Sequence, residues 1–70
     1  MIPYPIFLSV VCVLRNKEKL CEEIIKNLQD QISELTIDYE LIIIDNSSDD
    51  KTVQVLKKLM YLILFLLLLF

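Results

Sequence analysis

Residues 41–52 read Leu-Ile-Ile-Ile-Asp-Asn-Ser-Ser-Asp-Asp-Lys-Thr, and this stretch decides the fold. Four apolar residues in a row indicate a strand that is buried on both faces, as the strands of parallel sheets are. The acidic, hydroxyl-rich turn that follows is typical of the place where a strand of an open α/β sheet ends and a helix begins. Ligands of such sheets bind outside the carboxyl ends of the strands, beside helix N-termini. The stretch therefore predicts an α/β fold and a small-molecule site that suits a nucleotide-like group.

The sequence before this stretch completes a βαβ unit. Ile6–Leu14 is nearly all apolar and rich in β-branched residues, which indicates a first buried strand. From Lys17 to Leu35 the apolar residues recur at spacings of three and four, which indicates one amphipathic helix, with Asn16 placed to cap it. Tyr39–Ile44 is the second strand. Because parallel neighbours need a crossover, we expect a right-handed connection through the helix.

A second helix is expected after the turn. Apolar residues fall on one side of the segment from Val53 to Leu59. Its start is expected at a side chain that can accept hydrogen bonds from free backbone N–H groups, which Ser48, Asp49 or Asp50 can do.

The composition limits the classes of function. A net charge of −3 argues against a nucleic-acid partner, because phosphate binding needs a basic face. The chain has no histidine and no Cys-x-x-Cys pair, which excludes an ordinary zinc site. Cys12 and Cys21 are expected to be reduced, buried thiols. The chain also has no glycine, so positive φ angles are expected to fall to Asn16, Asn46 or Asp49.

The last part of the chain, Leu59–Phe70, is apolar without a break and follows the charged pair Lys57-Lys58. As a helix it would span about 18 Å, against a hydrocarbon core of about 30 Å. Three interpretations stay open: an aberrant end after a truncation, a segment that dips into one leaflet of a membrane, and a buried element of a soluble core. We treat this segment as a tail that follows the α/β unit.

Two motifs on either side of the long helix carry a family resemblance. Residues 9–17 read S-V-V-C-V-L-R-N-K, and residues 38–52 read D-Y-E-L-I-I-I-D-N-S-S-D-D-K-T. They resemble the start of the family-two glycosyltransferases with the GT-A fold, which commonly read S-V-V-I-P-x-Y-N-E and then D-Y-E-I-I-V-V-D-D-G-S-x-D-x-T. The resemblance covers about residues 8–59. The order and spacing of both motifs together make it specific.

The resemblance implies that the two strand ends form the nucleotide half of a nucleotide-diphospho-sugar site. Asp45 would accept hydrogen bonds from the base, typically uracil, and an ionised carboxylate suits this because it only accepts. Val13, Leu14 and Arg15 would line the base and the ribose. Asn16 would order the turn after the first strand. The expected ligand is a UDP-type nucleotide-sugar.

The chain departs from the family pattern at five positions. Proline, tyrosine and glutamate of the first motif are replaced by Val13, Arg15 and Lys17, and aspartate and glycine of the second by Asn46 and Ser47. Arg15 can still stack on a base, because its guanidinium group is planar. The departures bear on the identity of the donor more than on the fold.

The resemblance also implies what lies beyond the second motif in an intact relative. There a D-x-D motif holds Mg²⁺ or Mn²⁺ and a later residue is the catalytic base. Asp49-Asp50 is not that motif, since it belongs to the turn before the second helix. We therefore expect no cofactor in this chain and no transferase activity of the chain alone.

The sequence thus predicts a partial Rossmann-like (GT-A) βαβα unit, followed by an apolar C-terminal segment. Residues 1–58 would be the incomplete nucleotide-binding portion of a glycosyltransferase, truncated after its N-terminal part, and residues 59–70 the tail. Met1–Pro5 is expected to be an extended lead-in and no signal peptide. The expected location is the cytoplasm or the cytoplasmic face of the membrane, with membrane contact through Leu59–Phe70. The alternative is a small, non-enzymatic, membrane-anchored interaction protein.

Overall fold

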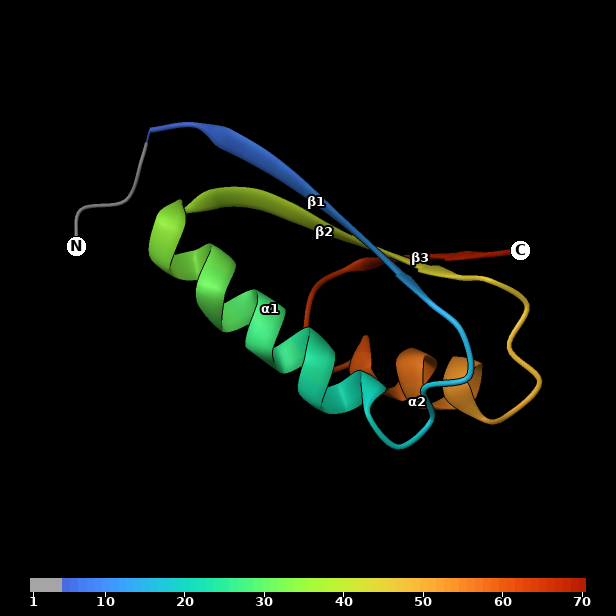
Figure 1. Cartoon of the computed structure of the whole chain (residues 1–70). Coiled ribbons are helices and arrows are strands. Elements are labelled where there is room, and N and C mark those ends of the chain that lie inside the picture. The colour runs from blue at the N-terminus through green and yellow to red at the C-terminus, as the bar shows by residue number, and fades with distance from the viewer. Residues whose placement is uncertain (1–4) are drawn as a thin grey trace.

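The computed structural model describes residues 5–70, which alternate between strand and helix (Figure 1). The elements are β1 (Phe7–Leu14), α1 (Cys21–Leu35), β2 (Asp38–Asp45), α2 (Thr52–Leu59) and β3 (Leu66–Leu69). The predicted α/β class is confirmed, and the βαβαβ order makes a partial Rossmann-like unit. The predicted lead-in lies outside the described residues except for Pro5.

The strands form one parallel sheet with β2 in its centre. β1 pairs with β2 over the whole length of both strands. β3 is shorter and pairs only with Ile42–Asp45, the second half of β2. The carboxyl ends of β1, β2 and β3 therefore meet at one end of the sheet, where ligands of open α/β sheets bind.

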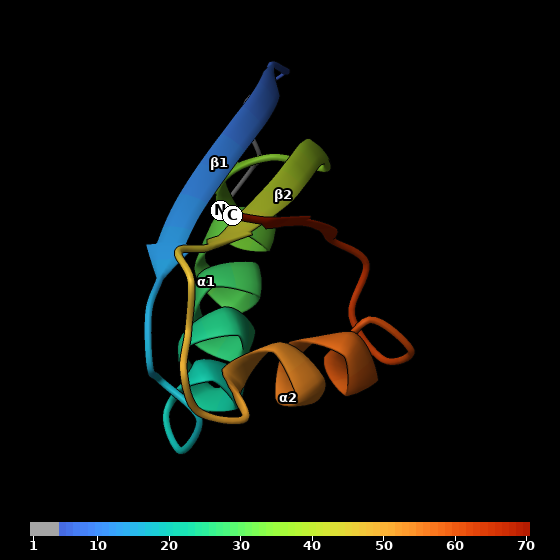
Figure 2. The ribbon, with the colours of Figure 1, turned by 90° about the vertical axis from the view of Figure 1, so that its right-hand side faces the viewer.

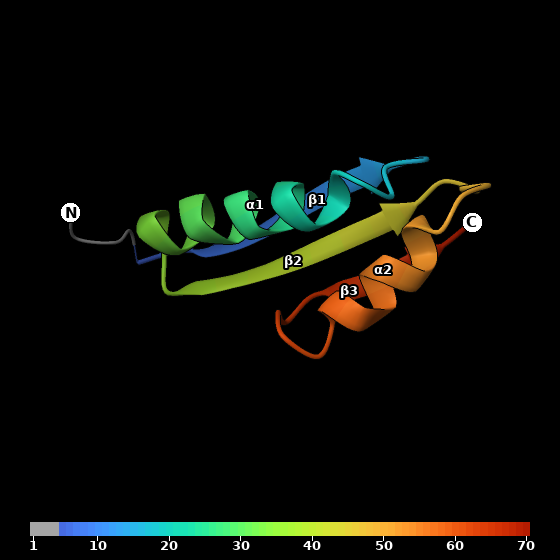
Figure 3. The same cartoon turned by 90° about the horizontal axis from the view of Figure 1, so that it is seen from below.

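Both helices lie on the same face of the sheet, as the views from the side and from below show (Figures 2 and 3). The burial of β2 agrees with this arrangement, because side chains alternate between the two faces of a strand. Leu41, Ile43 and Asp45 are buried beneath the helices, whereas Ile42 and Ile44 on the other face stay partly exposed.

The core lies between the helices and the covered face. Its members come from every element but β3 and also from the connection after α2: Leu14, Cys21, Ile25, Ile32, Leu41, Ile43, Leu56, Leu59, Ile63 and Phe65. Burying a large aliphatic side chain contributes about 1.5–3 kcal/mol. A chain of this size nevertheless buries only about 60% of its unfolded surface, so its core is small.

The uncovered face of the sheet is apolar in its centre. On β1, Phe7, Val11 and Val13 are each more than half exposed, and the register places Val11 beside Ile42. In a parallel sheet such neighbours project from the same face. No segment of residues 5–70 packs over this face as the helices pack over the other (Figure 3).

The apolar segment 59–70 takes part in the fold. Leu66–Leu69 forms β3, and Ile63 and Phe65 are buried in the core. The sequence did not predict this third strand, so the expected βαβα order is corrected to βαβαβ. No helix among the described residues is both long and apolar enough to cross a membrane.

The first helix starts later than predicted. It begins at Cys21 rather than Lys17, and the residues before it form a turn in which the amides of Leu20 and Cys21 both donate to the carbonyl of Lys17. The N-cap residue is Leu20, whose side chain makes no capping bond, so the prediction of Asn16 as the cap is wrong. Asn16 instead has a left-handed backbone, with φ of 50°.

The second helix begins as predicted just after the acidic turn. Its N-cap residue is Lys51, which makes no side-chain capping bond. The carboxylate of Asp50 accepts a hydrogen bond from the Thr52 amide at 2.9 Å, which satisfies one of the free N–H groups at the helix start. None of the three predicted residues is the N-cap, so that prediction is wrong, although Asp50 stands next to it and bonds to the first amide of the helix.

Candidate functional site

The candidate site lies where β1 and β2 end, and it is built from the loops that follow them. We call residues 15–20 the first loop and residues 46–51 the second loop. The two strands end side by side, with Leu14 opposite Asp45, and the Asn46 amide donates to the Leu14 carbonyl at 2.9 Å. The two loops therefore start next to each other, and side chains of one can reach the backbone of the other.

Asn16 joins the two loops with its backbone and its side chain. Its amide donates to the Ser48 hydroxyl at 2.9 Å, and its side-chain Oδ1 accepts from the Asp49 amide at 2.7 Å. The left-handed backbone of Asn16 turns the chain so that both bonds form. Asparagine tolerates this region better than most residues, because its short side chain can bond locally. The expectation that Asn16 orders the turn agrees with these contacts.

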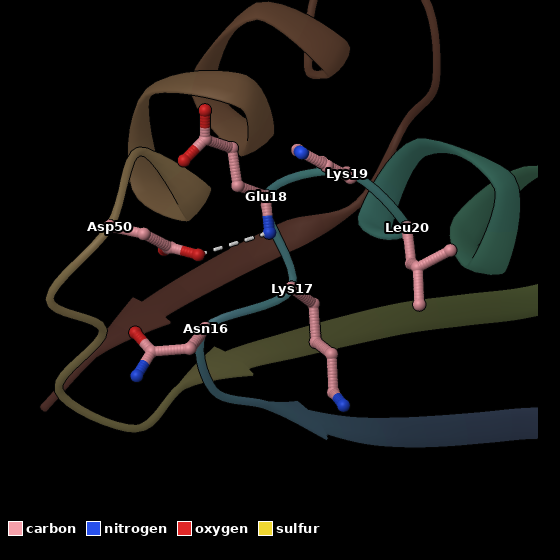
Figure 4. A pocket seen from close by; sticks show the side chains of 6 residues that line it. All are labelled: Asn16, Lys17, Glu18, Lys19, Leu20 and Asp50. Atoms are coloured by element: carbon pink, nitrogen blue, oxygen red, sulfur yellow. Dashed lines mark hydrogen bonds between the residues drawn. The ribbon is translucent and has the colours of Figure 1, made fainter.

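The next two amides of the first loop also bond to the second loop and the helix start. The Lys17 amide donates to the Thr52 hydroxyl at 2.9 Å, and the Glu18 amide donates to Asp50 Oδ2 at 3.3 Å. Figure 4 shows the Asp50 carboxylate directed at the Glu18 amide. In return, Glu18 Oε1 accepts from the Lys51 amide at 3.2 Å. The loops are thus held by hydrogen bonds that run in both directions.

Asp45 stands at the carboxyl end of the central strand and is only 2% exposed. Its Oδ2 accepts from the Ser48 amide at 3.1 Å, and its Oδ1 accepts from the Ser48 hydroxyl at 2.5 Å. The residue predicted to contact a base is therefore engaged with the second loop. A carboxylate offers about four lone-pair positions, so two remain after these bonds.

Val13 and Arg15 project differently from Asp45. Val13 is 60% exposed on the uncovered face, and the Arg15 side chain is 58% exposed. The guanidinium of Arg15 lies 3.8 Å from the carboxylate of Asp49, which is itself exposed. Exposed pairs of this kind contribute about 0–1 kcal/mol, so Arg15 can leave Asp49 at little cost. Val13 and Arg15, like the exposed Asn16, are therefore open to a ligand, whereas Asp45 is not.

The structure brings in residues that the sequence did not single out. Glu18 and Thr52 each bridge the loops, although neither was predicted as a site residue. Ser48 was expected only to cap a helix, but it connects the Asp45 carboxylate to the Asn16 amide. The alternation of Ser48, Asp50 and Thr52 is the signal in the sequence that could have indicated them.

Two of the depressions on the described surface lie near the ends of β2. One, of about 250 Å³, is lined by residues 16–20 and Asp50 (Figure 4). Lys17 and Lys19 extend to different sides of this loop, so they do not form a paired cationic site (Figure 4). The other, of about 540 Å³, lies at the opposite end of β2 between Tyr39 and Phe65. Neither depression gathers the predicted site residues together.

The acidic side chains of the loops do not fit a divalent metal. The oxygens of Asp45 and Asp50 already accept hydrogen bonds from hydroxyl and amide groups, and Asp49 faces Arg15. In the described part of the chain, no three side chains of the metal-ligating types gather as they would around an ion. We therefore assign Mg²⁺ or Mn²⁺ no place among these residues.

Two kinds of ionisable group in the structure have shifted pKa values. The pKa of the Asp50 carboxyl lies below its ordinary value, chiefly because the Thr52 hydroxyl donates to it and, more weakly, because backbone amides do. Burial raises the pKa of the Cys12 and Cys21 thiols, and both cysteines are free. The thiolate form is disfavoured at both positions, and neither cysteine lies in the loops of the candidate site.

The comparisons with known proteins agree with the motifs. The profile of glycosyl transferase family 2 matches residues 9–66. This range contains both loops, both helices and the start of β3. No curated protein and no solved structure matches the chain. Because the profile covers well over half of the sequence, the chain belongs to glycosyl transferase family 2.

Proposed function

We propose that the chain forms a nucleotide-binding unit of the glycosyltransferase type, with a uridine diphosphate group as its ligand. The observation that carries the proposal is the position of the family's two motifs. Both end at the carboxyl end of one parallel sheet, where hydrogen bonds fix the two loops against each other. This is the end at which open α/β sheets bind their ligands.

The carboxyl end of β1 is the place that best suits the ligand. Ligands of open α/β sheets bind where neighbouring connections leave toward opposite faces. The connections after β1 and β2 leave toward the same face, so the gap between these two strands is not such a point (Figures 2 and 3). In residues 5–70 both β1 and β3 are edge strands, and Val13 and Arg15 are exposed at the carboxyl end of β1, beside the end of β2 that carries Asp45.

Each residue of the proposed site supplies a different contact. Val13 offers an apolar surface to the base, and Arg15 offers a planar cation that can stack on a base or pair with phosphate oxygens. Asn16 sets the direction of the first loop. Asp45 keeps two lone-pair positions for a base N–H, and binding there needs the second loop to open, because the side chain is buried.

The experiment that tests the proposal is a titration of the 70-residue chain with uridine diphosphate up to millimolar concentration, followed by NMR. We expect shifts at Val13, Arg15 and Asn16, and weaker binding by Asp45→Ala. Asp38→Ala is the matched control, since Asp38 is an exposed aspartate at the opposite end of the same strand. A folded wild-type chain that shows no shifts at millimolar ligand overturns the proposal.

We also propose that the chain binds this ligand without transferring a sugar. The carboxylates of Asp45 and Asp50 are bonded to the amides of Ser48 and Thr52 and are not placed as free bases. In the same titration with a uridine-diphospho-sugar, we expect binding shifts but no release of uridine diphosphate over hours. Release above the buffer rate would show that the chain is catalytically competent.

Membrane contact through residues 59–70 is the alternative to this proposal and has its own test. Ile63 and Phe65 are buried in the core and β3 pairs with β2, so these side chains leave the fold if the segment enters a membrane. We expect the chain to remain in the supernatant when it is sedimented with vesicles of zwitterionic lipid. Cosedimentation of the folded chain would favour the alternative of a membrane-anchored interaction protein.

A further inference from the structure

We propose that Ser48, Asp50 and Thr52 are positioning residues whose side chains hold the first loop through its backbone amides. The proposal rests on the function proposed above, because it concerns the same nucleotide site. These three side chains accept hydrogen bonds from three successive amides of the first loop. The pairs are Asn16 N to Ser48 Oγ, Lys17 N to Thr52 Oγ1 and Glu18 N to Asp50 Oδ2. We call this set of three bonds the loop clasp.

The direction of each hydroxyl in the loop clasp is fixed by a carboxylate. Ser48 Oγ donates its proton to Asp45, and Thr52 Oγ1 donates its proton to Asp50. An ionised carboxylate can only accept, so the hydroxyl has to be the donor in each of these bonds. The lone pairs of both hydroxyls are then free to accept the amides of the first loop. The motif therefore contains two relays of the same kind, each running from an amide through a hydroxyl to a carboxylate.

The loop clasp bonds to the backbone of the first loop, and this explains why positions 15 and 17 tolerate different side chains. Arg15 and Lys17 stand where the family commonly has tyrosine and glutamate. The Lys17 side chain is exposed, and only its amide enters the loop clasp. A change of side chain at position 17 leaves the amide in place. Ser48, Asp50 and Thr52, in contrast, cannot lose their side-chain oxygen atoms without loss of a bond.

The consequence for binding is a fixed spacing between the ends of β1 and β2. Arg15 and Asn16 directly follow β1, and Ser48 fixes them relative to Asp45 at the end of β2. Groups that are held in place before binding cost less ordering entropy when the ligand arrives. Removal of a bond in the loop clasp should therefore weaken nucleotide binding, although none of its side chains needs to touch the nucleotide.

The test compares variants of the 70-residue chain that differ by one hydroxyl. Thr52→Val keeps the size of the side chain and removes the acceptor, whereas Thr52→Ser keeps the hydroxyl. We expect Thr52→Val to raise the hydrogen-exchange rate of the Lys17 amide roughly tenfold, as loss of one hydrogen bond does. We expect its affinity for uridine diphosphate to fall by a similar factor. Thr52→Ser should restore both values.

Two further variants keep the test decisive. Ser48→Ala removes the bond to Asn16 from a half-buried position, so it serves if Thr52→Val does not fold. Lys17→Ala is the matched control in the first loop, and we expect unchanged exchange and unchanged affinity. A purely structural loss would speed exchange throughout the sheet, including the Ile43 amide. Loss of the loop clasp should speed exchange only at residues 16–18.

The outcomes separate this proposal from the one before it. Unchanged exchange at residues 16–18 in both Thr52→Val and Ser48→Ala overturns the loop clasp. Faster exchange with unchanged affinity overturns the positioning role. If the wild-type chain shows no binding at all, the proposed function fails, and the exchange rates, measured without ligand, still decide whether the loop clasp holds the loop.

Discussion

The two loops at the carboxyl end of the sheet and the uncovered face of the same sheet are built in opposite ways. The loops are polar, and side chains of each loop accept hydrogen bonds from backbone amides of the other. The uncovered face is apolar in its centre and has no covering layer among residues 5–70. The polar groups of the loops find hydrogen-bond partners within the chain, whereas the uncovered face leaves apolar surface in contact with water.

This difference shows that the interactions that fix the positions of the loops are not the ones that supply most of the stability of the fold. A net hydrogen bond contributes about 0.5–1.5 kcal/mol, so the loops fix positions more than they stabilise the fold. The stabilising free energy comes from apolar burial, and only one face of the sheet supplies it. Sheets of parallel strands are ordinarily covered on both faces. A core of this size rarely contributes more than roughly 3–5 kcal/mol of stability, so each buried side chain counts.

The largest expected effect comes from a pair of neighbours on opposite faces of β2. Ile43 is completely buried under the helices, whereas Ile42 lies on the uncovered face. We expect Ile43→Ala to lower the free energy of unfolding by about 2–5 kcal/mol and to unfold most of the protein, and Ile42→Ala to cost less than half as much. Urea unfolding followed by circular dichroism measures both. Equal losses of unfolding free energy would mean that the second face is also covered in solution. The two faces of the sheet would then not differ as described.

The sequence predicted the first two strands and both helices because each has its own local signal. Apolar runs that end at polar turns gave β1 and β2 to within one residue, and the spacing of apolar residues gave α1 to its end at Leu35. β3 could not be predicted in this way. Every residue of Leu66–Leu69 is leucine, so no alternation separates an inner from an outer face. The strand exists because the free edge of β2 accepts it, and that is a tertiary effect.

The candidate site was predictable in its location and not in its contacts. The second motif placed Asp45 and the turn correctly at the end of a strand. The alternation of Ser48, Asp50 and Thr52 could have indicated one side of these contacts, but the hydrogen bonds join residues more than thirty positions apart, so the sequence does not reveal their partners in the first loop. Positive φ was expected at Asn16, Asn46 or Asp49. It occurs at Asn16 and at Ser47, the position where the family has glycine.

The next effect in size concerns this second left-handed residue. Ser47 has φ of 55°, which costs a residue with a Cβ about 1–2 kcal/mol relative to glycine. Ser47→Gly removes that cost, loses an exposed hydrogen bond to the Phe70 carbonyl, and makes the unfolded chain more flexible. We expect a net gain in stability of about 0.5–1 kcal/mol, seen as a rise in Tm of several degrees.

Asn16→Gly is the matched control for this effect. Asn16 has a similar φ, but its side chain accepts a hydrogen bond from the Asp49 amide. Glycine relieves the backbone there and loses that contact between the loops, so we expect no gain or a small loss of stability. A gain equal to that of Ser47→Gly would mean that the contact contributes nothing, and the view of the loops as a satisfied polar region would have to be given up.

The smallest expected effect is the response of the loops to acid. The pKa of Asp50 lies below its ordinary value of 3.8, first because of the Thr52 hydroxyl. A carboxyl whose pKa is lowered on folding adds stability above its unfolded pKa and loses it as the pH falls through the folded pKa. The amides of Glu18 and Thr52 should therefore keep their NMR shifts from neutral pH down to about 4 and change only below 3.8. Asp50→Asn keeps an acceptor oxygen and cannot titrate in this range, so its amides should not respond. A transition at or above pH 3.8 in the wild-type chain would show that Asp50 does not hold these amides. The view of the loops as a satisfied polar region, unlike the uncovered face, would then fail.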